Sequence, residues 1–436
     1  MRIFLTAKTL FRLSAFLLLF TLLAGDSNGQ YLLNSDSAFK AGTPNSGRIW
    51  GYAFGDFAFK SHQDSLNRGG SNQYTGIPKE RTSFQFRRIY LGYDYNISKK
   101  FSAELLLAAE DNFPAGNPPS SAAASGDELL NNKLSFYIKL MNIRWKNIWK
   151  GTDFIVGQIA TPAFPLLSEK MWNYRSIERT ISDIRRTPSY DLGASLQGVF
   201  DPQTKNFGYD LMVGNGSSAK PEADNFKWFY GDVYAYFLNK KLVFDIYGDY
   251  ERLNWLPTWH HSRQMWKGYI AFNSAATTKG IDPGNGFTVG LEFFVNNLKS
   301  DNFATKIAGG VDTLSTAANG ISFYVHGDIV KTKLRFFARF DAYNPNNKVD
   351  NNTYSKYVGN TGNYNDNSYS KGVTATGDQT YKQQFFTAGL DFMPAKNVHF
   401  MPNVWYNHYA TQLANSNADY DLVWRLTFFY SFGKSY

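Results

Sequence analysis

The chain ends with YDLVWRLTFFYSFGKSY, residues 420–436, and this stretch decides the fold. Its even positions up to 432 are all apolar or aromatic, whereas its odd positions are mostly polar. A period of two over so many residues predicts a β-strand with one apolar face and one largely polar face. Ending on such a strand, with an aromatic last residue, is typical of a transmembrane β-barrel that closes on its last strand.

Segments with the same alternation recur along the whole chain. We predict sixteen strands, at 49–59, 83–95, 101–110, 134–145, 152–159, 191–200, 207–213, 227–237, 242–251, 265–273, 286–296, 320–330, 333–343, 380–392, 398–409 and 419–432. Because the number is even, both ends of the barrel domain are expected on the same side of the membrane.

The predicted connections alternate between short and long. The short ones include 96–100, 147–151, 201–205, 238–241, 331–333 and 394–397, and the long ones are 60–82, 111–132, 160–190, 297–319 and 344–379. Short turns on one side and long loops on the other are the pattern of outer-membrane barrels. We therefore predict an all-β fold, a 16-stranded antiparallel transmembrane β-barrel with long extracellular loops and short periplasmic turns.

One stretch, 253–311, leaves two assignments open. The segment 303–311 can replace 265–273 as a strand without changing the count, and the connection 274–285 is long for a periplasmic turn. The pair His260 and His261 is expected in a surface loop of this stretch.

The beginning of the chain reads as an export signal. Basic residues up to Arg12 precede an apolar segment, 13–23, that is too short to span a bilayer, and small residues precede Gln30. We predict a signal peptide at 1–29, a periplasmic lead-in at 30–47 and the barrel at 48–436. The chain has no cysteine, which excludes disulfides and a lipoprotein anchor.

The formal charge of +9 has two interpretations. One is solubility and contact with anionic lipid headgroups, and the other is attraction of anions into a pore.

Alternation also predicts which charged side chains point into the barrel. In 333–343, Arg335, Arg339 and Asp341 share one face, and Leu334 and Phe336 lie on the other. Arginine at the lipid-facing midplane costs ~2–4 kcal/mol, so the charged face is expected inside. The same reasoning gives the lumen-facing set Arg88, Glu104, Asp245, Asp249, Glu292, Arg335, Arg339, Asp341 and Arg425. Such a polar lumen is predicted to be hydrated, although neighbouring Asp and Arg side chains that simply brace the wall are an alternative.

The third long loop, 160–190, mixes charged and aromatic side chains. In a 16-stranded barrel the channel stays open unless something narrows it, and guanidinium groups suit anions. We hypothesise that this loop folds inward and forms a pore constriction. The residues of this predicted constriction are Arg175, Glu178, Arg179, Arg185 and Arg186. The alternatives are an external loop that meets lipopolysaccharide, or a helix packed at a trimer axis.

Four stretches carry a family resemblance. They are RRIYLGYDYNISKKFSAELLL (87–107), VGQIATPAF (156–164), ERTISDIRRTPSYDLGASLQG (178–198) and FARFDAYNPNN (337–347). Together, and in this order, they resemble the phosphate-selective porins of the O and P type. The resemblance implies a 16-stranded, homotrimeric outer-membrane diffusion channel in which inward arginines and lysines favour anions such as phosphate. The clean strands here point more carboxylates than basic groups inward, so the charge preference stays open.

Motifs for other chemistry are not found in the sequence. There is no Gly-x-Ser-x-Gly elbow, the six histidines do not form a metal-site pattern, and no basic patch has nucleic-acid spacing. We predict no enzymatic activity, no cofactor, no metal site and no nucleic-acid partner. A barrel enzyme that acts on lipids is one alternative, but it would use a Ser–His pair on the lipid face, and His326 is predicted to point inward. An adhesion or surface-binding barrel is the other.

The predicted function is that of a porin, which allows passive diffusion of small hydrophilic solutes or ions. The predicted location is the outer membrane of a Gram-negative bacterium. The expected partners, besides the solutes or anions, are outer-membrane lipid and lipopolysaccharide, further copies of the chain in a homotrimer, and the barrel-assembly machinery, through the C-terminal strand.

Overall fold

The computed structural model describes residues 43–435 with gaps. The gaps are 67, 69–73, 75–76, 111–128, 131–132, 135, 186–187, 220–221, 223–224, 257–258, 360–380, 411 and 413–417. The predicted signal peptide, most of the predicted lead-in and Arg186 therefore lie outside the described residues. Within the described part, no helix is both long and apolar enough to cross a membrane.

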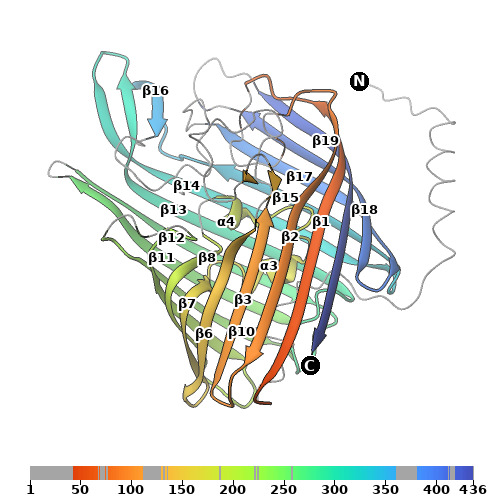
Figure 1. Cartoon of the computed structure of the whole chain (residues 1–436). Helices are drawn as coiled ribbons and strands as arrows, with labels where there is room; N and C mark the ends of the chain where they lie inside the picture. Colours follow the sequence, from red (N-terminus) through yellow and green to blue (C-terminus); the bar gives the residue numbers. More distant parts are fainter. Residues whose placement is uncertain are drawn as a thin grey trace, which may run out of the picture.

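Sixteen antiparallel strands form a closed barrel (Figure 1). They are β1 (Ser46–His62), β2 (Thr82–Asn96), β3 (Phe101–Glu110), β6 (Tyr137–Trp149), β7 (Thr152–Ala160), β8 (Tyr190–Val199), β9 (Phe207–Gly214), β10 (Trp228–Phe237), β11 (Leu242–Leu256), β12 (Trp259–Asn273), β13 (Phe287–Lys306), β14 (Val311–Val330), β15 (Leu334–Asn344), β17 (Lys382–Ala395), β18 (Val398–Ala410) and β19 (Asp419–Ser435). Each strand pairs with the next, and β19 pairs back onto β1. The predicted fold class is confirmed.

Three further short strands and two short helices lie in the long connections. Strands β4 (Leu129–Leu130) and β5 (Lys133–Leu134) form a small hairpin of their own, and β16 (Tyr354–Gly359) pairs with the far end of β13. Helices α3 (Ser168–Trp172) and α4 (Ile181–Ile184) both belong to the connection between β7 and β8. In Figure 1 they lie within the barrel.

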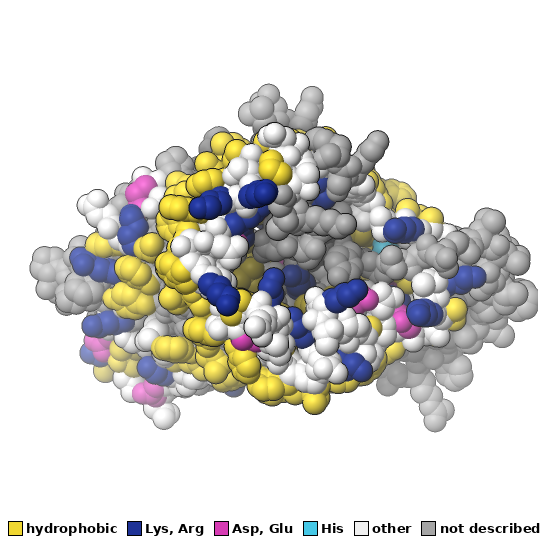
Figure 2. All heavy atoms as spheres, turned by 90° about the horizontal axis from the view of Figure 1, so that it is seen from below, with side chains coloured by type: hydrophobic (Ala, Val, Ile, Leu, Met, Phe, Trp, Pro, Cys, Tyr) yellow, Lys and Arg dark blue, Asp and Glu magenta, His cyan; other side chains and the backbone are white. Residues whose placement is uncertain are grey.

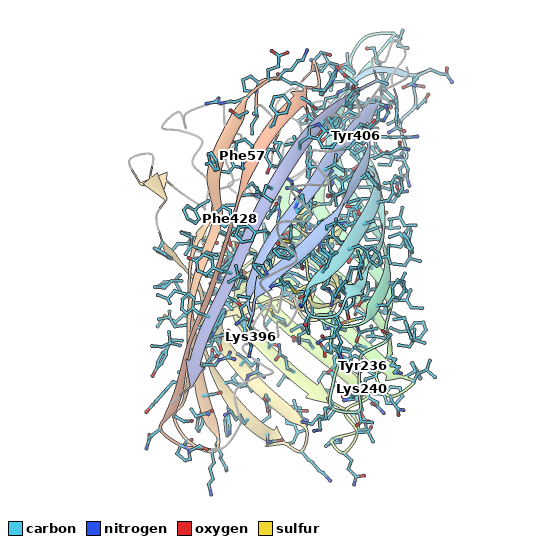
Figure 3. All side chains as sticks on the ribbon, turned by 90° about the vertical axis from the view of Figure 1, so that its right-hand side faces the viewer. Phe57, Tyr236, Lys240, Lys396, Tyr406 and Phe428 are labelled. Atoms are coloured by element: carbon cyan, nitrogen blue, oxygen red, sulfur yellow. The ribbon has the colours of Figure 1, made fainter. Side chains whose placement is uncertain are left out.

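The last strand shows how alternation builds the wall. Trp424, Leu426 and Tyr430 are exposed on the outer surface, whereas Arg425 and Thr427 are buried on the inside. Aromatic and aliphatic side chains stand off the outer surface all along the wall, and Phe57 and Phe428 are labelled among them in Figure 3. An apolar band on the outside of such a barrel is the surface that faces lipid. The barrel can lie in lipid because it is closed and leaves no backbone edge unpaired.

Two glycines allow the closing strands to approach. A Cβ atom on Gly51 would lie 2.6 Å from the ring of Phe432, and one on Gly55 would lie 2.6 Å from the ring of Phe428. The rings of β19 therefore lie across the positions where β1 has no side chain. This covering of strand glycines by aromatic rings fixes the register of the closure.

The predicted long loop 297–319 is wrong. Strands β13 and β14 continue through most of it and form a hairpin that projects from the upper end of the barrel (Figure 1). The register shifts between Leu298 and Asn302, and beyond this point the hairpin also pairs with β16. Outside the bilayer no face of the strand contacts hydrocarbon, so apolar and polar residues need not alternate. The sequence pattern therefore fades although the strands continue.

Two neighbouring predictions also need correction. Strand β12 begins at Trp259, so His260 and His261 lie in a strand rather than in a surface loop. The segment 265–273 is confirmed as part of β12, and the alternative strand at 303–311 is wrong, because residues up to Lys306 belong to β13.

The long connection after β12, residues 274–286, folds toward the barrel interior. Arg335 on β15 donates hydrogen bonds to the carbonyl oxygens of Pro283 (3.1 Å) and Gly284. Ile281 packs against the hydrophobic cluster that contains Trp172 of α3. The unusual length of this connection is thus used to reach into the barrel from the end that carries the short turns.

The assignment of faces predicts a depth-dependent cost of charge. Phe293 on β13 is 48% exposed on the outer wall, and Ile97, in the turn after β2, is 44% exposed. Phe293→Arg should destabilise the folded barrel by ~2–4 kcal/mol and Ile97→Arg by only about 0–1 kcal/mol, because the penalty falls toward the interface. Urea unfolding in lipid vesicles measures both. Equal costs for the two variants would contradict the placement of the bilayer.

Candidate channel constriction

The connection between β7 and β8, residues 161–189, is called the inner loop here. Its neck is closed by Thr161, whose hydroxyl donates to the carbonyl of Pro188 (2.6 Å) and whose N–H donates to that of Ser189 (3.1 Å). Nearly every described residue beyond the neck is buried. Of the three interpretations of this loop, the structure selects the inward one, with α3 and α4 inside the barrel (Figure 1).

Strand side chains hold the inner loop by its backbone. Arg339 on β15 donates to the carbonyl of Arg179 (2.6 Å), and Arg425 on β19 donates to that of Ile177 (3.1 Å). Arg87 on β2 reaches Ser176 O (3.3 Å), and a ring nitrogen of His326 on β14 lies 2.9 Å from Met171 O. Carbonyl groups of an irregular loop have no ladder partner, so these side chains supply the hydrogen bonds that buried backbone needs.

Further contacts involve the loop's side chains and its other backbone groups. Trp405 Nε1 on β18 donates to Glu178 Oε2 (2.9 Å), and the Tyr174 hydroxyl donates to Asp391 Oδ2 on β17 (3.1 Å). Ser182 N–H donates to Glu292 Oε1 on β13 (3.2 Å). Lys267 on β12 donates to the carbonyl of Ala163. Eight strands, β2, β12, β13, β14, β15, β17, β18 and β19, thus contact the loop.

An aromatic cluster packs the inner loop against the wall. The rings of Tyr174 and Phe337 are 4.7 Å apart, and the rings of Trp172 and Tyr324 are 5.1 Å apart. Trp172 Nε1 also donates to the carbonyl of Glu178 (2.8 Å), which closes the loop on itself. The loop is therefore fixed by both apolar packing and hydrogen bonds, and it reduces the open cross-section of the barrel.

The described arginines of the inner loop are all engaged. Arg175 pairs with Glu169 and with Asp183 (2.9 Å), and Arg179 lies 3.7 Å from Asp183. Arg185 lies over the ring of Tyr343, 4.2 Å from its centroid. Burial alone would lower the pKa of Arg175, but the two carboxylates raise it well above its usual value. Carboxylates of the loop itself thus compensate Arg175 and Arg179, whereas Arg185 contacts a ring of β15.

A charged cluster lies on β2, β3 and β6. Glu110 accepts from Arg88 (2.6 Å) and from Lys139, and it also accepts from the hydroxyl of Tyr90. Arg88 and Lys139 each contact that same hydroxyl, at 2.9 Å and 3.2 Å. Arg175 of the inner loop is close enough to interact electrostatically with Glu110. This cluster therefore faces the charged side of the inner loop.

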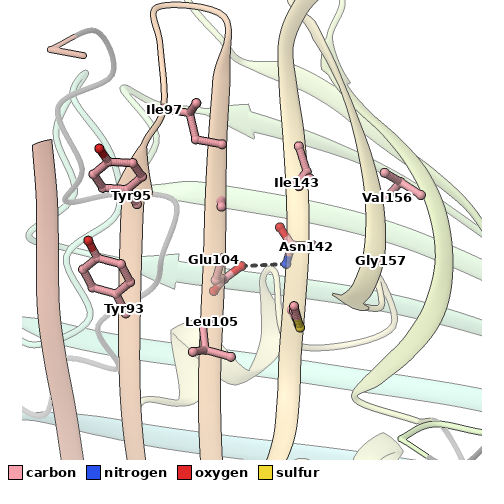
Figure 4. A pocket seen from close by; sticks show the side chains of 11 residues that line it. Tyr93, Tyr95, Ile97, Glu104, Leu105, Asn142, Ile143, Val156 and Gly157 are labelled. Atoms are coloured by element: carbon pink, nitrogen blue, oxygen red, sulfur yellow. Dashed lines mark hydrogen bonds between the residues drawn. The ribbon is translucent and has the colours of Figure 1, made fainter. Parts of the chain in front are cut away.

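The other lumen-facing residues also have partners. Glu104 accepts from the Asn142 amide across β3 and β6 (Figure 4), and Asp245 pairs with Lys267 at 3.1 Å. Asp249 accepts from the hydroxyl of Tyr247 at 2.7 Å. Arg335 pairs with Asp328 and Arg339 with Asp341, both at 2.5 Å. Many of the inward charges therefore brace the wall, and several also hold the inner loop.

Sequence reasoning missed four residues that hold the inner loop: Arg87, Trp405, Asp391 and Lys267. Alternation along β17 and β12 is the signal that would have placed Asp391 and Lys267 inside. No local pattern pairs Trp405 with Glu178, because the two are 227 positions apart. Among the described residues, no group of three or more His, Asp or Glu side chains is arranged to hold a metal ion.

Comparison with known proteins gives structural matches only. No family model and no curated protein matches the sequence. The outer-membrane channel DcaP of Acinetobacter baumannii is similar in structure, with a TM-score of 0.56 and 11% identity over 91% of this chain and 100% of that one. OmpF of Salmonella typhi in complex with daunomycin gives a TM-score of 0.53 and 10% identity over 89% of this chain and 98% of that one.

An anion-selective porin from Comamonas acidovorans also has a TM-score of 0.53, with 10% identity over 89% of this chain and 100% of that one. At such low identity these likenesses show a shared fold, the 16-stranded barrel already described.

Proposed function

We propose that this chain is an outer-membrane porin through which small hydrophilic solutes or ions diffuse passively. The observation that carries the proposal is the inner loop, which side chains from eight strands hold inside a closed barrel. A barrel of this strand number encloses an aqueous channel, and a fixed internal loop sets its narrowest section. The likeness to solved porins and channels supports the same proposal.

Conductance across a planar lipid bilayer tests the proposal directly. Purified protein should produce discrete, ohmic current steps in potassium chloride, because diffusion through a wet pore needs no chemical cycle. Protein that inserts but never conducts would refute the channel and leave the adhesion barrel as the better explanation.

The finer proposal is an anion preference, as the resemblance to phosphate-selective porins implies. The buried charges of the described residues nearly balance, with 17 carboxylates and 15 basic groups, so we expect any such preference to be weak. The reversal potential in a salt gradient measures it.

A triple substitution tests whether the inner-loop arginines contribute. Changing Arg179, Arg185 and Arg186 to Ala should shift the reversal potential toward cation preference, because the sequence of the inner loop loses three positive charges. The matched control removes three exposed lysines outside the inner loop: Lys299 on β13, Lys348 after β15 and Lys356 on β16. An unchanged potential in the arginine variant would remove this loop from the selectivity argument.

The alternative of a lipid-acting enzyme is disfavoured by His326. This side chain is buried between Met171 O and a guanidinium nitrogen of Arg335 (3.2 Å), inside the barrel and away from the lipid. We therefore propose that the protein is not an enzyme. Lipid hydrolysis that vanished on His326→Ala would overturn this.

The remaining proposals concern export and assembly. We propose that residues 1–29 direct export, that the C-terminal strand engages the barrel-assembly machinery, that the outer loops meet lipopolysaccharide and that three copies associate. An apolar hollow on the outer wall, lined by Tyr93, Leu105, Met141 and Val156 among others, offers a packing surface (Figure 4). Chemical cross-linking in native membranes tests the trimer. If only the monomer band appears on the gel, the proposed trimer is contradicted.

A further inference from the structure

Lysine is concentrated at one end of the barrel. Seven connections, six short and one long, join the strands at this end, at 97–100, 150–151, 200–206, 238–241, 274–286, 331–333 and 396–397. Together they contain ten lysines and two aspartates, with no arginine and no glutamate, and each connection has at least one lysine. The lysine rim consists of Lys99, Lys100, Lys150, Lys205, Lys240, Lys241, Lys279, Lys331, Lys333 and Lys396. Figure 2, seen from this end, shows basic side chains around the rim and few acidic ones.

The two aspartates offset only a small part of the charge of the ten lysines. Asp201 accepts hydrogen bonds from the hydroxyl of Thr204 and from two backbone N–H groups of its own turn, which lowers its pKa to about 2. Asp282 accepts from the side-chain amide of Asn285 at 2.9 Å. Within the described chain, no ion pair joins a lysine of the rim to a carboxylate. All of these lysines except Lys240 are exposed or partly exposed.

The opposite end of the barrel is different, because carboxylates lie among its basic side chains and several of these groups pair with one another. Lys227 lies 2.5 Å from Glu222, Lys306 lies 2.8 Å from Asp312, and Arg68 lies 2.8 Å from Asp64. Among the described residues, the lysines of the rim therefore lack the carboxylate partners that several basic groups of the opposite end have.

The lysine rim lies directly beyond lipid-facing aromatic and aliphatic side chains. Lys100 precedes Phe101, Lys150 follows Trp149, and Lys331 follows Val330, and all three apolar side chains are exposed on the outer wall. Lys240 differs from these three, because it lies over the ring of Tyr236, which packs against the interior cluster; both are labelled near the lower end of the barrel in Figure 3. Aromatic residues at the ends of barrel strands mark the bilayer interface, so these ammonium groups lie at the depth of lipid headgroups.

The choice of lysine points to a mobile, distributed ligand. A site built for one phosphate or carboxylate uses the planar, bidentate guanidinium of arginine, which these connections lack. Single ammonium groups spaced around a whole circumference act as point charges, and they suit a layer of exchangeable headgroups rather than one bound molecule.

We propose that the lysine rim binds the anionic headgroups of the phospholipid leaflet on its side of the membrane. This anchors that end of the barrel in the headgroup layer and enriches anionic phospholipid around it. The inference rests on the proposed transmembrane placement, but not on conduction, so its failure and the failure of the channel proposal are distinguishable.

Spin-labelled lipids test the proposal on the full protein. The protein is reconstituted in phosphatidylcholine vesicles, and electron paramagnetic resonance gives the association of labelled phosphatidylglycerol with the protein relative to labelled phosphatidylcholine. We expect a preference of about twofold averaged over the whole boundary layer, because one lysine favours a contacting anionic headgroup by roughly a factor of five. One molar salt should abolish the preference, because it shortens the screening length to about 3 Å.

Two matched variants localise the effect. The rim variant changes Lys100, Lys150, Lys205, Lys331 and Lys396 to Gln, and the outer variant changes Lys79, Lys299, Lys348, Lys356 and Lys382 to Gln. Both lose five charges, but only the rim variant should lose the lipid preference. A preference that survives in the rim variant, or falls equally in both, would overturn the proposal. If the rim variant does not fold, the salt series on the unaltered protein decides. A lipid preference that persists in one molar salt would also overturn the proposal.

A separate arm distinguishes lipid from cell-wall polymer. Sedimentation of the unaltered protein and of both variants with isolated peptidoglycan measures binding to the other anionic surface near this end. Rim-dependent sedimentation without any lipid preference would overturn the lipid assignment, whereas lipid preference without sedimentation supports it.

Discussion

Removal of the inner loop should raise the single-channel conductance several-fold. Replacing residues 165–185 by a short Gly-Ser linker leaves the neck hydrogen bonds of Thr161 in place, and it removes α3, α4 and the aromatic cluster. The wall contains 16 strands, enough to enclose an aqueous channel without this loop. Conductance in a planar bilayer measures the change, and unaltered conductance would show that the loop does not limit flow.

The absence of cysteine provides a second test that does not depend on deleting the loop. Lys170 lies in α3 and is partly exposed inside the barrel, whereas Lys348 lies in an outer loop. A bulky thiol reagent should lower the conductance of Lys170→Cys and leave that of Lys348→Cys unchanged, because only the first label occupies the narrowed section. Equal responses of the two variants would contradict the assigned constriction.

The largest loss of stability is expected from Glu110→Gln. Glu110 is buried between Arg88, at 2.6 Å, and Lys139, so the substitution leaves two adjacent buried cations without their shared anion. Breaking a buried pair from one side costs about 3–5 kcal/mol. Urea unfolding of the protein reconstituted in lipid, followed by tryptophan fluorescence, measures the difference in the free energy of unfolding.

A surface pair is the matched control for this prediction. Lys227 and Glu222 are 2.5 Å apart but partly exposed, so Glu222→Gln should cost only about 0–1 kcal/mol. The double variant Glu110→Gln with Lys139→Met should recover part of the loss, because one of the two uncompensated charges is gone. Similar costs for Glu110→Gln and Glu222→Gln would mean that the lumen wall is well hydrated at this cluster.

The wall of the barrel was largely predictable from the sequence because lipid imposes a simple rule. Each wall residue faces either hydrocarbon or the interior, so alternation in β19 and β15 identified strands and their faces together. The rule fails where lipid ends. The upper part of the β13–β14 hairpin stays paired beyond a register shift between Leu298 and Asn302, but its polar positions gave no periodic signal.

The inner loop was predictable only in part. Its length and its charged and aromatic composition suggested an inward position among other possibilities. Its fixation depends on contacts across the barrel, such as Arg425 to Ile177 O, which join positions 248 residues apart. A hydrogen bond to a backbone carbonyl leaves no mark in the sequence, because every residue has the same carbonyl group whatever its side chain. The sequence placed Arg175, Arg179 and Arg185 in this loop, but the partners of their side chains became evident only in the structure.

Because the first strand pairs with the last, the barrel can close only after the last strand has been synthesised. Arg48 on β1 lies opposite Ser435 on β19, near the two ends of the described chain. A nascent polypeptide that terminates early lacks β19, and it would leave the edges of β1 and β18 open to other chains. Only chains that contain β19 can saturate both edges, so prematurely terminated copies should remain recognisable to chaperones and proteases as unfinished.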